Sequence, residues 1–184
     1  MAATVSPPDV VAFWQGVGWE KWYAADPKLD AGIRARFETA WHAGRAGAFA
    51  TWTETPQGTL ALLILLDQFP RNMFRGQADS FASDAQAREI ARHAIAHNVD
   101  LDVDMAMREF FYTPLMHSED IADQDWCVVL IEARLGGKEG KNHPFALQHR
   151  DIIRRFGRFP ARNAALGRTT TREEAAFLAA QPHR

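Results

Sequence analysis

Apolar residues recur at intervals of three and four along most of the chain, which is the spacing of amphipathic helices. Capping residues, prolines in first turns and closing glycines divide this pattern into segments. The first two predicted helices run from residue 7 to Gly16 or Gly18, and from Pro27 or Asp30 to between Gly44 and Gly47. Further helices are predicted over 56–69, 81–95, 103–112, 120–134 and from about 143 to 156. A capping box at residues 171–174 opens the last predicted helix, over 175–180. No run with a period of two is long enough to predict a strand. The sequence therefore predicts an all-α protein of about eight helices in antiparallel pairs.

The secondary structure that the pattern predicts is less direct at two places. Residues 126–131 are apolar on all sides, and six such residues also suit a buried strand. The polar residues on either side of them favour a helix, the most buried one of the chain. Thr113 and Pro114 are expected to end the helix before them, because the residue that precedes a proline disfavours the helical conformation.

The composition narrows the class of protein. The 184 residues are 47% hydrophobic and 24% charged, so we expect a single packed domain over residues 1–184. The longest apolar run, Leu60–Leu66, is far shorter than the roughly 20 residues of a membrane span. The first residues show no signal-peptide pattern, and the net charge of −2 gives no reason to expect nucleic acid. We expect a cytoplasmic protein whose partner is neither a membrane nor a nucleic acid.

The charges are distributed unevenly along the chain. Residues 100–125 contain eight acids and one base, whereas residues 141–168 contain seven bases and one acid. In one interpretation the two stretches pair with each other or form solvated helix faces. In the other, the bases form an anion pocket. Six of the seven bases are arginines, which bind carboxylate or phosphate through two parallel hydrogen bonds.

The first polar motif covers residues 66–76. Asp67 lies at the end of a strongly apolar predicted helix, where an unpaired carboxylate is costly. We expect its partner to be Arg71, Arg75 or an arginine of the later cluster. Arg71 and Arg75 share a face only if the helix continues past Pro70.

The second polar motif covers residues 112–120. His117 lies beside Ser118 and two carboxylates, and a histidine with a carboxylate partner can transfer protons near neutral pH. The alternative is that Ser118 is the N-cap of the next helix, with Glu119 and Asp120 favoured by the helix dipole.

The third polar motif lies at a helix end that Gly157 and Pro160 define. Arg154, Arg158 and Arg162 gather there, and phenylalanines alternate with them. Such an end can aim guanidinium groups at a ligand while the rings anchor the backbone. The alternative is that the rings belong to the core and the arginines extend from it into solvent.

The sequence shows no pattern for a metal or a cofactor. His93 and His97 are four residues apart, but they lack a third ligand. The sequence contains no glycine-rich phosphate loop, zinc-protease motif or nucleophile elbow. Cys127 lies in the apolar run and is interpreted as a packing thiol. We therefore expect neither a bound metal nor a cofactor.

The three polar motifs carry a resemblance to a known family. Residues 65–76, 111–119 and 149–168 resemble, in this order, three signatures of a bacterial family known only as domain of unknown function number 924. Residues 11–14 and 173–178 also fit the family, so the resemblance covers nearly the whole chain.

The resemblance implies a tetratricopeptide-like, right-handed array of helices, and it implies no established activity, substrate or cofactor. This chain departs from the family at two places. Ala161 stands where the family usually has histidine, and residues 170–172 read Thr-Thr-Arg in place of Ser-Thr-Pro. Because Ala161 has no group that can transfer a proton, position 161 is not among the candidate catalytic residues.

The leading hypothesis is a helical binding module with an arginine-rich polar pocket for a small anionic ligand or an acidic peptide. The pocket is predicted to be lined by Asp67, Arg71, Asn72, Arg75, His117, Glu119, Arg154, Arg158, Arg162 and Asn163. The alternative is a hydrolase of a small phosphorylated or carboxylated substrate, with His117 as general base, Glu119 or Asp67 as its partner and arginines holding the anion. A third interpretation is structural, with the motifs serving packing and capping.

Overall fold

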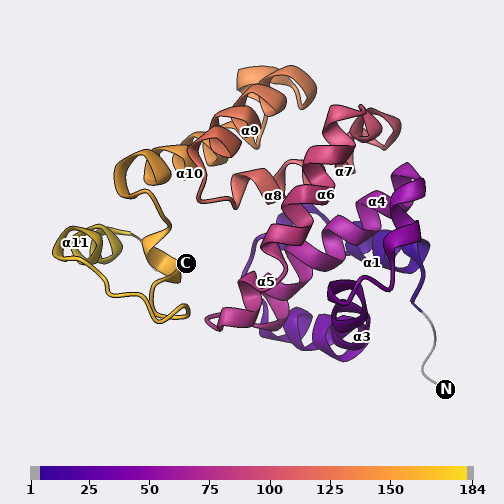
Figure 1. Cartoon of the computed structure of the whole chain (residues 1–184), viewed down its shortest axis with the longest axis horizontal. Helices are drawn as coiled ribbons and strands as arrows, with labels where there is room; N and C mark the ends of the chain where they lie inside the picture. The colour runs from indigo at the N-terminus through magenta and orange to yellow at the C-terminus, as the bar shows by residue number, and fades with distance from the viewer. Residues whose placement is uncertain (1–4, 182–184) are drawn as a thin grey trace. The chain divides into compact units, whose positions relative to one another are not determined.

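The structure is a computed structural model, and it describes residues 5–181 (Figure 1). Every regular element within that range is helical, which confirms the predicted all-α fold. The chain forms two compact units. Of the described residues, 5–75 and 79–114 form the N-terminal unit, and 76–78 and 115–181 form the C-terminal unit. The single domain stays a prediction, since it concerns whether the two units unfold together.

The N-terminal unit is built on a core of aromatic and aliphatic side chains. Its helices are α1 (Pro7–Val17), α2 (Trp19–Trp22), α3 (Pro27–Arg45), α4 (Pro56–Leu63), α5 (Phe69–Met73), α6 (Asp84–Ala96) and α7 (Met105–Arg108). Helix α1 packs on α4, α3 on α5, and α4 on α6. The Phe69 ring lies 5.5 Å from the Trp14 ring and 4.7 Å from the Phe37 ring, which joins α1, α3 and α5 in one apolar cluster.

Most helices begin where the capping residues predict. Asp26 accepts the N–H groups of Lys28 and Leu29 at the start of α3. Thr55 accepts the N–H of Gly58 at 3.1 Å at the start of α4. These side chains replace the partners that the first turn of a helix lacks.

The helix that contains α4 and α5 continues past Pro70 through a π-turn at Ile64–Gln68. A proline inside a helix leaves the carbonyl four residues earlier without its N–H donor. In this segment the bonds span five residues, since the Phe69 N–H donates to the Ile64 carbonyl, and the buried Ser83 hydroxyl donates to the Leu66 carbonyl in the turn before Pro70. The Trp41 Nε1–H donates in turn to the Ser83 oxygen at 3.0 Å. A side-chain relay therefore supports the backbone in the turn before Pro70.

The segment predicted as one helix over 103–112 differs in the structure. Helix α7 gives way to a 3-10 turn at Glu109–Phe111, and α8 (Thr113–Met116) follows directly. The helical segment does end before Thr113, as predicted, but Thr113 and Pro114 do not lie in a turn, because a new helix begins there with Pro114 in its first turn. A proline in a first turn removes no helical hydrogen bond.

The C-terminal unit contains α9 (Ile121–Arg134), α10 (His143–Phe156) and α11 (Arg172–Ala180). Helices α9 and α10 lie side by side in Figure 1 and form an antiparallel pair. Residues 126–131 are helical as predicted, but Val129 is 60% exposed, so this helix is not buried on all sides. A capping box of Thr171 and Glu174 begins α11, also as predicted.

No helix among the described residues is both long and apolar enough to cross a membrane.

Candidate functional site

The first motif gives Arg71 two carboxylate partners within the N-terminal unit. Its two terminal nitrogens donate to both Asp84 oxygens at 2.9 Å, and Nη1 lies 3.2 Å from Asp67 Oδ1. Nη1 also donates to the Asp67 carbonyl at 2.6 Å. The Asp67 side chain is almost fully buried and therefore needs a partner. That partner is Arg71, one of the expected arginines, which lies four residues later along the same continuous helix.

The other two residues of this motif hold the start of α3. The Asn72 amide donates to Asp30 at 2.8 Å and accepts from Gln68 at 3.1 Å. The Arg75 Nε donates to the second Asp30 oxygen at 2.6 Å. Each predicted polar side chain of the first motif therefore binds a neighbour inside its own unit.

A tyrosine and a carboxylate that the sequence analysis did not single out lie in the same unit. Tyr23 donates its hydroxyl to Glu109 at 2.8 Å, and Glu109 is buried. Tyr23 is 49% exposed as a residue, but its hydroxyl meets the buried Glu109, and desolvation there, together with the charges of Glu109 and Asp67, raises the pKa of Tyr23 well above its usual value. The hydroxyl therefore stays a donor over the physiological pH range. No local sequence signal marks this pair, because 86 residues separate its members.

The second and third motifs meet in the C-terminal unit at Glu119. Arg168 donates to both Glu119 oxygens at 2.8 and 3.0 Å, and the Phe159 N–H donates to one of them at 2.8 Å. Partial burial opposes ionisation of Glu119, but these hydrogen bonds and the charges of Arg168 and Arg162 lower the pKa of this carboxyl below its usual value. Glu119, one of the two partners that the hydrolase interpretation gives to His117, is therefore held by Arg168.

His117 lies in the turn that precedes α9. Its carbonyl accepts from Arg162 at 2.8 Å, and its ring lies 6.3 Å from the ring of His149. The N-cap of α9 is Asp120, whose side chain accepts the Ala122 N–H. One interpretation expected Ser118 to be this N-cap, and that expectation is wrong.

The Ser118 hydroxyl instead stabilises the turn by hydrogen bonds to two residues that follow it. It accepts the Asp120 N–H at 3.1 Å and donates to the buried Asp123 at 2.7 Å. The Gln124 amide donates to the carbonyls of Met116 and Ser118. This turn is therefore fixed by side chains of α9.

Side chains of the third motif bind Glu174, a buried residue of α11. Arg158 donates to its two oxygens at 2.7 and 2.9 Å, and the Asn163 amide donates at 3.2 Å. The hydrogen bond from Arg158 and that from the Thr171 N–H lower the pKa of Glu174 to about 2. One carboxylate thus caps α11 and binds the arginine that follows α10.

The pKa of Glu174 predicts a pH dependence of stability. Because the pKa is about 2 in the fold and 4.5 ordinarily, the ionised carboxylate stabilises the fold fully above pH 4.5, and this contribution is lost as the pH falls toward 2. Glu174→Gln should therefore lower the urea midpoint at pH 7, and its difference from the wild type should shrink between pH 4.5 and 2. Glu173→Gln, at an exposed neighbour, is the control. A difference that stays constant over this range would contradict the assignment.

Arg154 completes the set and contacts Asp125 of α9 at 2.7 Å. In this unit the acidic and basic stretches do pair, as the simpler interpretation of the charge pattern expects. Four of the ten predicted ligand-binding residues belong to the N-terminal unit and six to the C-terminal unit. The pocket they were predicted to form stays a prediction, and an incoming anion would have to replace carboxylates that already bind Arg71, Arg75, Arg154 and Arg158.

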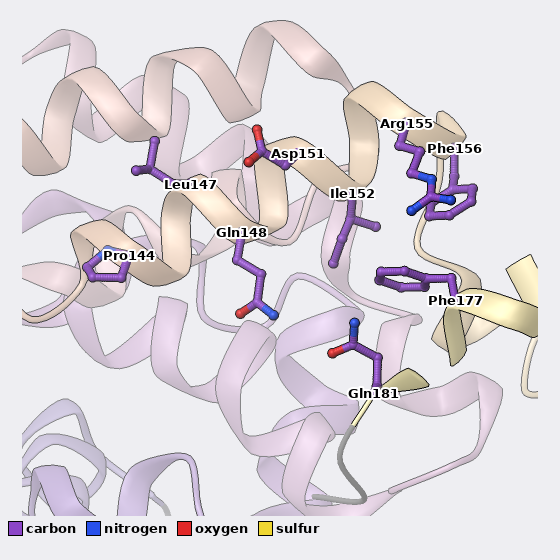
Figure 2. A pocket seen from close by; sticks show the side chains of 9 residues that line it. All are labelled: Pro144, Leu147, Gln148, Asp151, Ile152, Arg155, Phe156, Phe177 and Gln181. Carbon is purple, nitrogen blue, oxygen red and sulfur yellow. The ribbon is translucent and has the colours of Figure 1, made fainter. Parts of the chain in front are cut away.

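A hollow that the sequence analysis missed lies between α10 and α11. It is a groove of about 490 Å³ lined by Pro144, Leu147, Gln148, Asp151, Ile152, Arg155, Phe156, Phe177 and Gln181, and we call it the α10–α11 groove. Figure 2 shows Gln148 and Ile152 projecting from α10, with Phe177 and Gln181 on the opposite side. The rings of Phe156 and Phe177 lie 5.0 Å apart. The Arg155 guanidinium lies over both rings, 4.8 Å from Phe156 and 5.8 Å from Phe177.

The remaining candidates for chemistry are inert or carry no metal geometry. Cys127 is buried, and burial and the charge of Asp123 raise the pKa of its thiol far above the usual value. The rings of His93 and His97 lie 4.3 Å apart. Among residues 5–181, no group of three or more histidine, cysteine or acidic side chains is arranged to hold a metal ion.

These features define an all-helical protein whose polar motifs tie helices together within each unit. The chain belongs to the family described as "Bacterial protein of unknown function (DUF924)", whose model matches residues 10–182. It is similar to a solved structure, the protein of unknown function ATU0120 from Agrobacterium tumefaciens, with 42% sequence identity. The alignment covers 94% of this chain and 96% of that chain, with a TM-score of 0.88. No curated protein matches the sequence.

Proposed function

We propose that the chain is a tetratricopeptide-like binding module and that the α10–α11 groove binds an acidic peptide segment. The observation that carries the proposal is Arg155, an exposed cation whose guanidinium lies within 6 Å of two phenylalanine rings at the edge of an apolar groove. A guanidinium offers its donors in a planar fork, which suits a carboxylate. The apolar walls suit the side chain beside that carboxylate in a peptide.

Arg155 differs from the arginines of the predicted pocket in what an incoming carboxylate must displace. Its partner is Glu173 at 2.9 Å, and the two side chains are 54% and 63% exposed. Such a pair contributes at most about 1 kcal/mol, so a peptide carboxylate can replace Glu173, which returns to water. Arg158, in contrast, binds Glu174, whose side chain is only 3% exposed. Displacing it would leave a buried carboxylate without its arginine.

Arg155 is the one cation among the residues that line the groove, and Asp151 is the one carboxylate. Recognition of an acidic segment therefore rests on its contact with Arg155 and not on a net charge of the surroundings. Gln148 and Gln181 offer amide groups that can pair with the backbone of an extended peptide.

The proposal is tested with a fluorescein-labelled peptide that alternates aspartate or glutamate with leucine and phenylalanine, followed by anisotropy. Arg155→Gln should weaken binding by at least about tenfold, since a charge-assisted hydrogen bond contributes roughly 1.5–3 kcal/mol. Arg172→Gln, which removes the same charge from an exposed residue outside the groove, should change the affinity less than about twofold by loss of long-range attraction alone. Equal losses in the two variants, or no binding of the acidic peptide by the wild type, would refute the proposal.

A further inference from the structure

A second groove lies in the N-terminal unit along α6. It consists of two adjoining hollows of about 440 and 340 Å³. The larger is bounded by the end of α3, the 3-10 turn Ala50–Glu54 and α6, and the smaller continues toward Val99. Thr53, Glu89 and Ile90 line both hollows, so the two form one continuous surface, which we call the α6 groove.

The walls of the α6 groove are apolar and held in place. Phe49, Leu62 and Ile90 line the larger hollow. The Phe49 ring stacks on Trp52 with the ring centres 4.4 Å apart and the planes 14° from parallel. Gln86, on the α6 side, donates to the Gly44 carbonyl at 3.0 Å, which ties α6 to the end of α3. A partner therefore meets a preformed surface and pays little ordering entropy in it.

The α6 groove differs in charge from the α10–α11 groove, whose lining carries both Arg155 and Asp151. The residues that line the two hollows include one carboxylate, Glu89, and one imidazole, His93, and neither lysine nor arginine. The Glu89 side chain is 74% exposed, and its contact with Arg88 is a long one of 3.9 Å to the adjacent residue. The carboxylate at the junction of the hollows is thus accessible to a cation from outside.

We infer that the α6 groove is a docking site for a segment of a partner protein in which apolar residues flank a lysine or arginine. The apolar side chains fill the two hollows, and the cation between them pairs with Glu89. The inference goes beyond the function proposed above, because it concerns another unit and a partner of the opposite charge. Two hollows that meet at one acid match an extended segment better than they match a single compact ligand.

The test uses a fluorescein-labelled peptide with a lysine between leucine and phenylalanine residues, again followed by anisotropy on the full chain. Glu89→Lys places two like charges together and should weaken binding by at least about tenfold. Glu20→Lys is the matched control, because Glu20 is an exposed acid of the same unit outside the groove and its substitution changes the net charge equally. It should change the affinity less than about twofold. Far-UV circular dichroism should show both variants as helical as the wild type, since both side chains are exposed.

A second readout locates the peptide independently of any substitution. Bound peptide should slow amide hydrogen exchange in residues 49–54 and 86–94 and leave residues 144–156 unchanged. Arg155→Gln should bind the basic peptide as the wild type does, so failure of the acidic-peptide proposal leaves this result unaffected.

Four results would overturn the inference. The first is equal weakening of peptide binding by Glu89→Lys and Glu20→Lys, and the second is protection from hydrogen exchange outside the α6 groove. The third is that spermidine binds and the peptide does not. The fourth is that the peptide does not bind and the chain instead self-associates in a way that Glu89→Lys abolishes.

Discussion

Replacing Gly58 by alanine should destabilise the N-terminal unit by about 3 kcal/mol. An added Cβ would lie 2.2 Å from the Trp52 carbonyl oxygen and 2.9 Å from Thr55 Oγ1. Both belong to the short turn that enters α4, and the Thr55 oxygen is the cap of that helix. The turn must therefore open before the methyl group fits. Urea unfolding followed by tryptophan fluorescence measures the change, because five of the six tryptophans lie in this unit.

The sign of this effect is informative, because alanine ordinarily stabilises a helix by about 1 kcal/mol relative to glycine. Gly32→Ala is the matched control, since Gly32 lies inside α3 and no atom approaches within 4 Å of its added Cβ. That variant should unfold at a higher urea concentration than the wild type. If Gly58→Ala also raised the midpoint, the close approach of the Trp52 carbonyl would be refuted.

Arg71→Met should cost about 3 kcal/mol, because it removes the guanidinium that faces both Asp67 and Asp84. The Arg71 and Asp67 side chains are 15% and 2% exposed, so the carboxylate cannot turn to water in compensation. Methionine keeps most of the apolar length of the side chain, which separates the loss of charge from the loss of packing.

Arg34→Met provides the comparison for this result. Arg34 forms a similar i,i+4 pair with Glu38, but on the surface of α3. Its removal should cost less than about 1 kcal/mol in the same urea measurement. Equal and small effects of the two substitutions would show that Arg71 is not part of the fold's support. In that case its role as a ligand-binding residue would regain weight.

The helices that could be predicted are those with local start signals. Asp26, Thr55 and Thr171 each bind an N–H group two or three residues later, so the sequence near the cap contains the whole interaction. The continuation of the helix past Pro70 could not be predicted in this way. It depends on Ser83 and Trp41, and the latter donates across 42 residues of sequence.

The candidate site shows the same division between local and distant information. The clustering of arginines could be read from the chain, and so could the pairing of Arg71 with Asp67, but the more distant partners could not. Arg168 meets a carboxylate 49 residues earlier and Arg75 one 45 residues earlier. The two grooves were missed for a related reason. Phe177 and Ile90 fit the apolar stripes of ordinary helices, and only the packing of a second element beside each of them makes a hollow.

The burial of Cys127 has a practical consequence for work on both grooves. It is the one cysteine of the chain, and at neutral pH its enclosed thiol stays protonated, so it does not form the thiolate that reacts with maleimides. A cysteine substituted at the rim of either groove would then carry the accessible thiol. One dye could be attached there selectively in the native sequence background, and its fluorescence would report which peptide occupies which groove.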